Sequence, residues 1–217
     1  MKFVEIKLNS KELSNKINKP RICGIGIDDS DYKTMLSING LKIQCQYYRV
    51  WKQMIHRCYG KNSSAGTYKN CYVSTSWLKF MNFREWMRVQ QWEGKVLDKD
   101  LKVPGNKMYS PKTCMFVSNR INCLFTNLER KYPRGVFLQQ NHDIYFVSCT
   151  DENGDVKHIG HYKSMQKASN EYIKYKTKII NKICAKLTDI ELINMLKNYV
   201  LYIEKENNRK IININLY

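Results

Sequence analysis

Residues 97–122 read LDKDLKVPGNKMYSPKTCMFVSNRIN, and this stretch has the clearest local pattern in the chain of 217 residues. An apolar run ends at Asp98, and a polar loop with the turn residues Pro-Gly-Asn at 104–106 follows it. A second apolar run at 114–117 leads to Ser118, a residue type that favours the N-cap of a helix. The stretch therefore predicts a strand, a long loop, a short strand and a helix.

Two helices are predicted before this stretch. From Tyr47 to Cys58, apolar residues recur every three or four positions, which is the spacing of a helix that buries one face. The other face of this helix carries Arg49, Lys52, His56 and Arg57. A second, aromatic-rich helix is predicted from Ser76 to Val89. Its aromatic side chains indicate a core, with bases stacked on them as the alternative. Earlier still, the Asn39-Gly40 pair predicts a tight hairpin.

The chain is strongly basic. It has 37 Lys and Arg against 19 Asp and Glu, a net charge of +18, so a polyanion is the expected partner. Residues 1–133 carry +14 of this charge and residues 134–217 carry +4, so the first part is expected to meet the polyanion. No run approaches the roughly 18 apolar residues that a membrane span needs. We therefore expect neither a membrane partner nor a secretory signal, and a cytoplasmic location.

The eight cysteines are spread along the chain without a Cys-x-x-Cys pair. The simplest interpretation is that they are reduced thiols that pack as small hydrophobic side chains. A zinc site is the weaker alternative, and its ligands would be Cys58, Cys71, Cys114 and Cys123.

The order of these segments resembles the HNH-type homing-endonuclease-like proteins of phages and mobile elements, over about 80 residues from Tyr48 to Asn127. The motifs that carry the resemblance are Trp51…Met54…Arg57-Cys58, Trp77…Phe80…Phe83, Leu97-Asp98-Lys99-Asp100, Tyr109-Ser110-Pro111…Cys114 and Asn122…Asn127. The resemblance implies a ββα-metal finger in which Asp98 and Asn122 hold one Mg²⁺ or Mn²⁺ ion through oxygen ligands.

The same resemblance places Lys99 where the family has its general-base histidine, and Thr113 where it has a middle asparagine. A lysine is protonated at neutral pH, and losing general-base assistance typically slows a reaction by roughly 10²–10⁴-fold. Lys99 is therefore interpreted as a contact to the scissile phosphate, or else as a lysine with altered basicity, with Asp100 or His56 as the substitute base. The expected track for the DNA backbone is formed by Lys95, Lys102, Lys107, Lys112 and Arg120.

Residues 134–162 alternate as three short strands, and a helix is predicted from Ser164 to Cys184. With Gly135-Val136 and Ile159-Gly160-His161-Tyr162, this region resembles the AP2-type DNA-binding module, although Tyr145 stands where a tryptophan is usual. The resemblance implies that one face of the sheet enters the major groove. By alternation, the expected contacts are Arg134, Gln139, Tyr145, Lys157 and His158. An ordinary solvated face is the alternative.

A metal site formed by His158 and His161 is not expected, because residues three apart in a regular strand point to opposite faces. Near the C-terminus, Thr188 and Glu191 form a capping-box pattern before an amphipathic helix, which is expected to dock within the chain or else to form a homodimer. The tail at 211–216 has the composition of a strand and is expected to pair with a sheet edge.

Together these patterns predict an α+β protein: a helical segment and an HNH-like ββα finger, followed by an AP2-like three-stranded antiparallel sheet with its helix. The predicted parts are an N-terminal lobe at 1–46, the finger domain at 47–131, the AP2-like module at 132–185, and a helix and tail at 186–217.

The expected function is binding of double-stranded DNA with metal-dependent cleavage or nicking, weakened by the missing histidine. The alternative is a catalytically silent phage protein that binds DNA or RNA, or that occupies the nucleic-acid channel of a host defence complex.

Overall fold

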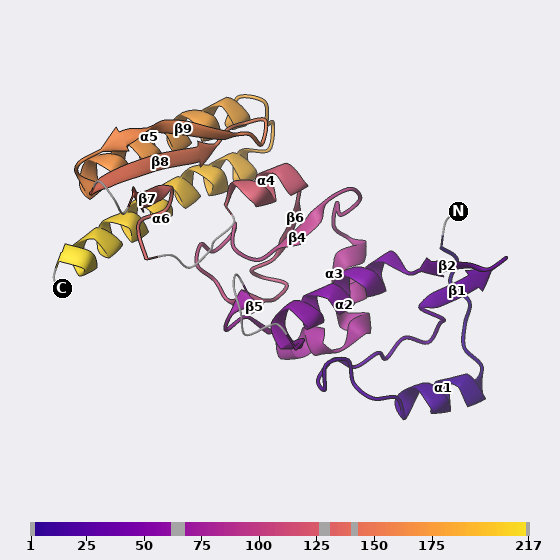
Figure 1. Ribbon diagram of the computed structural model, residues 1–217. Helices are drawn as coiled ribbons and strands as arrows, with labels where there is room; N and C mark the ends of the chain where they lie inside the picture. The colour runs from indigo at the N-terminus through magenta and orange to yellow at the C-terminus, as the bar shows by residue number, and fades with distance from the viewer. Residues whose placement is uncertain (1–2, 62–67, 126–130, 140–142, 216–217) are drawn as a thin grey trace. The chain divides into compact units, whose positions relative to one another are not determined.

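The computed structural model describes residues 3–61, 68–125, 131–139 and 143–215. The chain forms two compact units, Met1–Asn119 and Arg120–Tyr217 (Figure 1). Both contain helices and strands, which confirms the predicted α+β class. The predicted boundaries at residues 46, 131 and 185 divide the chain more finely than these units and stay predictions.

The first unit begins with helix α1 (Ser10–Ile17) and a hairpin of β1 (Met35–Ile38) and β2 (Leu41–Gln44). Ile38 pairs with Leu41, so the loop has two residues. Those residues, Asn39 and Gly40, have φ values of +50° and +78°. Two central residues with positive φ match the twist of the strands, which confirms the predicted turn.

The core of the first unit lies between α2 (Gln46–Tyr59) and α3 (Phe80–Arg88). Trp51 on α2 is fully buried, and its Nε1 donates a hydrogen bond of 2.8 Å to the backbone oxygen of Trp77. Phe80 and Phe83 on α3 are also fully buried. The predicted helix at 47–58 and the core role of the aromatic residues are therefore confirmed.

The second predicted helix is interrupted. The segment forms a 3-10 turn, η2 (Thr75–Leu78), and α3 starts after an extended residue, Lys79. The reason is tertiary: the backbone N–H of Ile27 donates to Leu78 O at 2.7 Å, and the N–H of Phe80 donates to Ile27 O at 2.9 Å. A single continuous helix would lose this pairing with a distant segment.

Four short strands complete the first unit. β4 (Val96–Asp98) pairs antiparallel with β6 (Met115–Val117), and β3 (Tyr72–Val73) pairs parallel with β5 (Met108–Tyr109). The predicted strand, loop and second strand of residues 97–117 are thus confirmed. Helix α4 (Asn119–Leu124) begins directly after Ser118 and spans the division between the units.

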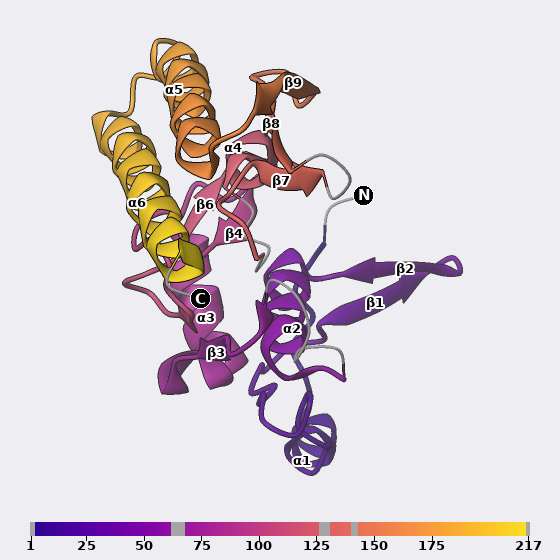
Figure 2. The ribbon, with the colours of Figure 1, turned by 60° about the vertical axis from the view of Figure 1, so that its left-hand side comes forward.

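The second unit combines a three-stranded antiparallel sheet with two long helices. The strand order is β7 (Val136–Gln139), β8 (Ile144–Thr150) and β9 (Val156–Tyr162). Helix α5 (Met165–Cys184) packs on one face of the sheet, and α6 (Ile190–Asn215) lies along α5 (Figures 1 and 2). The hydroxyl of Ser164 accepts a hydrogen bond from the N–H of Lys167, so the predicted start of this helix is confirmed.

The tail was predicted as a strand, and this prediction is wrong. Helix α6 continues to Asn215, because Ile203, Asn207 and Ile211 recur at four-residue steps and are all buried. The helix also begins with a different cap, since the carboxylate of Asp189 accepts a hydrogen bond of 3.0 Å from the N–H of Leu192. Its packing on α5 confirms that it docks within the chain.

All eight cysteines are free thiols, and most of them pack as small core side chains. The buried ones are Cys45, Cys58, Cys71, Cys114, Cys149 and Cys184. Burial raises the pKa of Cys58 and of Cys114 to about 12, so both thiols are protonated at neutral pH. In the described part of the chain, no three His, Cys, Asp or Glu side chains gather as a metal site.

Candidate functional site

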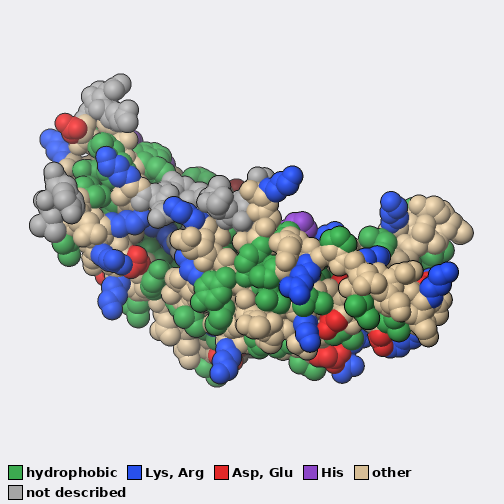
Figure 3. Space-filling model, turned by 90° about the horizontal axis from the view of Figure 1, so that it is seen from below, with side chains coloured by type: hydrophobic (Ala, Val, Ile, Leu, Met, Phe, Trp, Pro, Cys, Tyr) green, Lys and Arg blue, Asp and Glu red, His purple; other side chains and the backbone are tan. Residues whose placement is uncertain are grey.

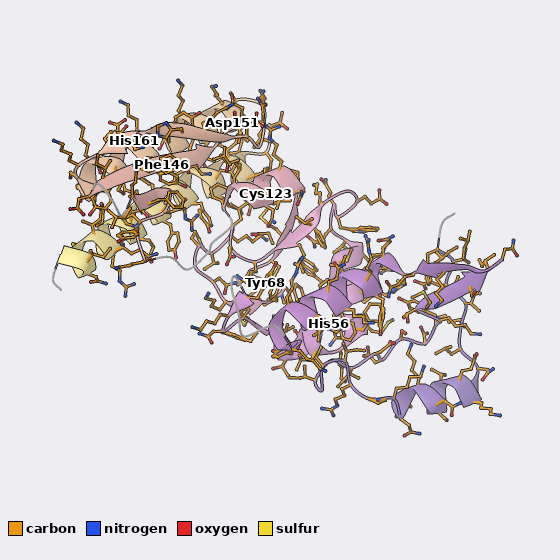
Figure 4. The ribbon with its side chains drawn as sticks, viewed as in Figure 1. His56, Tyr68, Cys123, Phe146, Asp151 and His161 are labelled. Atoms are coloured by element: carbon orange, nitrogen blue, oxygen red, sulfur yellow. The ribbon has the colours of Figure 1, made fainter. Side chains whose placement is uncertain are left out.

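A cavity of about 630 Å³ lies beside α2 in the first unit. Its described lining is basic and polar, with no acidic residue among the side chains that the structure describes there. The lining residues are Gln44, Arg49, Lys52, Gln53, His56, Arg57 and Tyr68. Figure 4 labels His56 on α2 and Tyr68 nearby. Three permanently charged basic side chains line this one hollow, so its electrostatic potential is positive.

The position of this cavity follows from the periodicity of α2. The apolar side of the helix, with Trp51 and Met54, is buried in the core, so the basic side is turned outward. Two of its side chains are held by neighbours. The guanidinium of Arg57 lies 5.3 Å from the centre of the Tyr68 ring, and the Nδ1 atom of His56 lies 3.3 Å from Cys23 Sγ. The basic face was visible in the sequence, whereas the contribution of Tyr68 was not.

Asp98, the predicted metal ligand at the end of β4, supports the following turn. Its Oδ1 accepts hydrogen bonds from the backbone N–H groups of Asp100 and Leu101, at 2.9 and 2.7 Å. Burial raises the pKa of this carboxyl, and the two N–H groups act in the opposite direction. Asp98 belongs to the first unit and Asn122, on α4, to the second. Their predicted sharing of an Mg²⁺ or Mn²⁺ ion stays a prediction.

Lys99 was predicted to contact a phosphate, which stays a prediction, and in the structure this side chain is buried and paired. Its side chain is 5% exposed. Its Nζ donates to Asp100 Oδ1 at 2.6 Å and to the backbone oxygen of Asn106 at 3.0 Å. The ammonium therefore belongs to the interior of the loop. Asp100, which was predicted as a substitute base, is the partner of this buried ion pair.

Asn106 and Thr113 organise the same loop, and their roles were missed from the sequence. The amide of Asn106 donates to the backbone oxygens of Lys99 and Met108, and its Oδ1 accepts from the N–H of Met108. The hydroxyl of Thr113 donates to the same Met108 oxygen at 2.8 Å. The Pro-Gly-Asn pattern predicted a turn but carried no signal for these contacts.

The residues predicted to line the DNA backbone are all exposed. Four belong to the first unit, Lys95, Lys102, Lys107 and Lys112, and Arg120 belongs to the second. On the face of the molecule that Figure 3 shows, Lys and Arg side chains recur over much of the surface and Asp and Glu occupy fewer places. The predicted track is thus available to solvent.

Two of the predicted contacts in the second unit do not lie on the open face of the sheet. Tyr145 shares its side of β8 with the buried Val147 and Cys149, so it points towards the helices. Arg134 lies against α6: its N–H donates to Asn207 Oδ1 at 2.7 Å, and its guanidinium is 5.9 Å from the centre of the Tyr199 ring. These side chains support the packing of the unit.

The other three predicted contacts are exposed. Gln139 ends β7, and Lys157 and His158 lie near the start of β9. The ammonium of Lys157 is 3.6 Å from the carboxylate of Asp151 and 3.8 Å from that of Asp155, so it forms ion pairs with two residues of the turn between β8 and β9. His158 stacks on the ring of Phe146, with 4.8 Å between ring centres and 12° between ring planes.

A β-bulge overturns the expectation that His158 and His161 point to opposite faces. Val147 pairs with Gly160 and Ser148 with His158, so β9 has one extra residue, Ile159, at this point. Both imidazoles therefore lie on the open face, with their ring centres 4.7 Å apart. Figure 4 labels Phe146 and His161 on this sheet. The available signal was Gly160, because an isolated glycine in a strand pattern suggests a bulge.

No family model, curated protein or solved structure matches this chain. Of the helices that the structure describes, none combines the length and apolar character that crossing a bilayer requires.

Proposed function

We propose that this protein binds nucleic acid through its phosphates, with the cavity on α2 as the main contact. The observation that supports this most directly is the lining of the cavity, where Arg49, Lys52 and Arg57 surround one hollow and none of the described lining side chains is acidic. The net charge of +18 and the exposed lysines of residues 95–112 add to the attraction.

The chemistry of these side chains suits phosphates. A guanidinium can donate two parallel hydrogen bonds to one phosphate, and a lysine acts as a compact positive charge. The neutral amides of Gln44 and Gln53 add hydrogen-bond donors without adding charge. Each phosphate that is neutralised releases condensed counterions, so binding through this cavity must weaken as salt rises.

The proposal concerns binding and includes no cleavage step. Lys99 is buried in an ion pair with Asp100, and Asp98 already accepts two backbone hydrogen bonds. These contacts account for the conformation of the 98–106 loop. They also occupy the Lys99 ammonium and the Asp98 carboxylate, the two groups that the predicted cleavage would need. We therefore derive no reaction step from them.

A charge-matched comparison tests the proposal. In one variant Arg49, Lys52 and Arg57 are changed to Gln, and in a control the exposed residues Lys11, Lys19 and Lys42, which do not line the cavity, are changed to Gln. Affinity for a labelled DNA duplex is measured by fluorescence anisotropy over a range of KCl concentrations. Losing three phosphate contacts makes the negative slope of log K against log salt shallower by about 2.7, at about 0.9 per contact.

The control variant is expected to keep nearly the full slope of the parent protein. Equal losses in both variants would show that only net charge matters, and a parent protein that binds no nucleic acid would end the proposal. Competition by single-stranded DNA and by RNA identifies the preferred polyanion.

Plasmid incubated with Mg²⁺ or Mn²⁺, alongside Asp98→Ala and Asn122→Ala, tests the cleavage hypothesis separately. Nicking that both substitutions abolish would revive that hypothesis.

A further inference from the structure

The open face of the second unit's sheet carries a pair of imidazoles that the proposed phosphate contacts do not use. His158 and His161 come from the same strand, β9, and the extra residue Ile159 brings them to one face. Both are exposed, and their ring centres are 4.7 Å apart with an angle of 56° between the ring planes.

The ring of Phe146 on the neighbouring strand limits the freedom of both imidazoles. It lies parallel to the His158 ring, at 4.8 Å and 12°, and its centre is 5.7 Å from that of His161. Phe137 lies on the other side of Phe146, at 5.8 Å. Packing of this kind reduces the conformational entropy that two exposed histidines would lose on binding a common ligand.

We propose that His158 and His161 together bind one divalent transition-metal ion of the Ni²⁺, Cu²⁺ and Zn²⁺ class, with water in the remaining coordination positions. Neutral imidazole is a preferred ligand of these metals. A metal–nitrogen bond is about 2.0–2.1 Å long and the nitrogen is about 1.1 Å from the ring centre, so two adjacent ligands at 90–110° place their ring centres roughly 4.5–5.2 Å apart. The observed separation falls within this range.

The surroundings favour a positive ion at this place. An imidazole that carries metal charge is attracted to the face of the phenyl ring on which it stacks. The outward-facing neighbours Ser148 and Thr150 are uncharged, and Lys157 is paired with Asp151 and Asp155. With only two protein ligands, the site is expected to exchange its metal readily and to follow the general order of affinity, in which Ni²⁺ binds more tightly than Co²⁺.

Titration of the full chain with Ni²⁺ by isothermal calorimetry tests the site. One equivalent of Ni²⁺ is expected to bind. The His158→Ala and His161→Ala variants are each expected to bind it at least about 10-fold more weakly, since even the loss of a residue that only supports a metal ligand costs this much affinity. His142→Ala is the control, and it covers a histidine that lies outside the described residues. This variant is expected to bind Ni²⁺ as the parent does.

A further variant, Phe146→Leu, retains both imidazoles but loses the stacked ring, and it is expected to bind more weakly than the parent. Circular dichroism verifies that each surface variant is folded. The proposal is overturned if the parent binds no Ni²⁺, if either sheet variant retains the parent affinity, or if a control variant loses binding instead. None of these results depends on whether the cavity on α2 binds nucleic acid.

Discussion

Replacing Lys99 by Met separates its two possible roles, because the buried ion pair and the phosphate contact predict opposite results. The substitution keeps the length of the side chain but removes the ammonium. It leaves the carboxylate of Asp100, which is 21% exposed, without its partner, and it leaves the backbone oxygen of Asn106 without this donor. Removing one member of a buried pair costs about 3–5 kcal/mol, and partial exposure of Asp100 reduces this to about 2–4 kcal/mol.

The unfolding of the first unit can be followed selectively, since all four tryptophans, Trp51, Trp77, Trp86 and Trp92, lie within it. With a urea m-value of about 2 kcal/mol/M, a loss of 3 kcal/mol lowers the midpoint of the fluorescence transition by about 1.5 M. Asp100→Asn and the double variant complete a thermodynamic cycle. The coupling energy between Lys99→Met and Asp100→Asn is expected to be about 1–2 kcal/mol, as for side chains in direct contact.

The phosphate interpretation predicts a different pattern. If Lys99→Met leaves the urea midpoint unchanged but reduces the affinity for DNA, then Lys99 turns outward in solution and the buried ion pair is not its main role. A coupling energy near zero would also exclude a stabilising ion pair between Lys99 and Asp100.

Three further predictions concern contacts inside each of the two units. Gly135→Ala should destabilise the second unit by at least about 3 kcal/mol in a thermal melt, because a Cβ at this residue, with φ of +78°, would lie 2.0 Å from the Tyr172 ring. Gly154→Ala, where φ is +96° but no atom lies within 4 Å of the added Cβ, should cost only about 1 kcal/mol. Asn106→Ala should lower the free energy of unfolding of the first unit by about 2–3 kcal/mol, since it leaves three backbone groups of the loop without this partner, and an unchanged urea midpoint would contradict this role. Burial lowers the pKa of Lys176, whose Nζ donates to Leu124 O at 2.7 Å, below 10.5. The unfolded state therefore binds more protons between the two pKa values, so stability rises with pH there and is lost as pH falls through the folded-state pKa. Between pH 7 and pH 10, the urea midpoint of the parent should rise relative to that of Lys176→Met. Equal changes in the two midpoints would exclude the effect.

The local features of the fold were predictable from the sequence because a few neighbouring residues encode them. The three-to-four spacing of apolar residues places one face of α2 in the core and the basic face in solvent. Asn39 and Gly40 tolerate the positive φ values that a two-residue turn requires. The hydroxyl of Ser164 satisfies an N–H group at the start of α5. These patterns also predict the α+β class and the basic face that lines the cavity.

Other features depend on partners that are distant in the chain, so they arise only when the chain packs. Ile27 interrupts the helix at Lys79 by pairing with it, and Asp100 and Asn106 bury Lys99 despite its charge. The bulge at Ile159 arises from pairing between strands, and it places His158 and His161 on one face where strict alternation would separate them. A periodic pattern states which residue types recur, whereas burial, pairing register and the neighbours of a charge are properties of the packed chain.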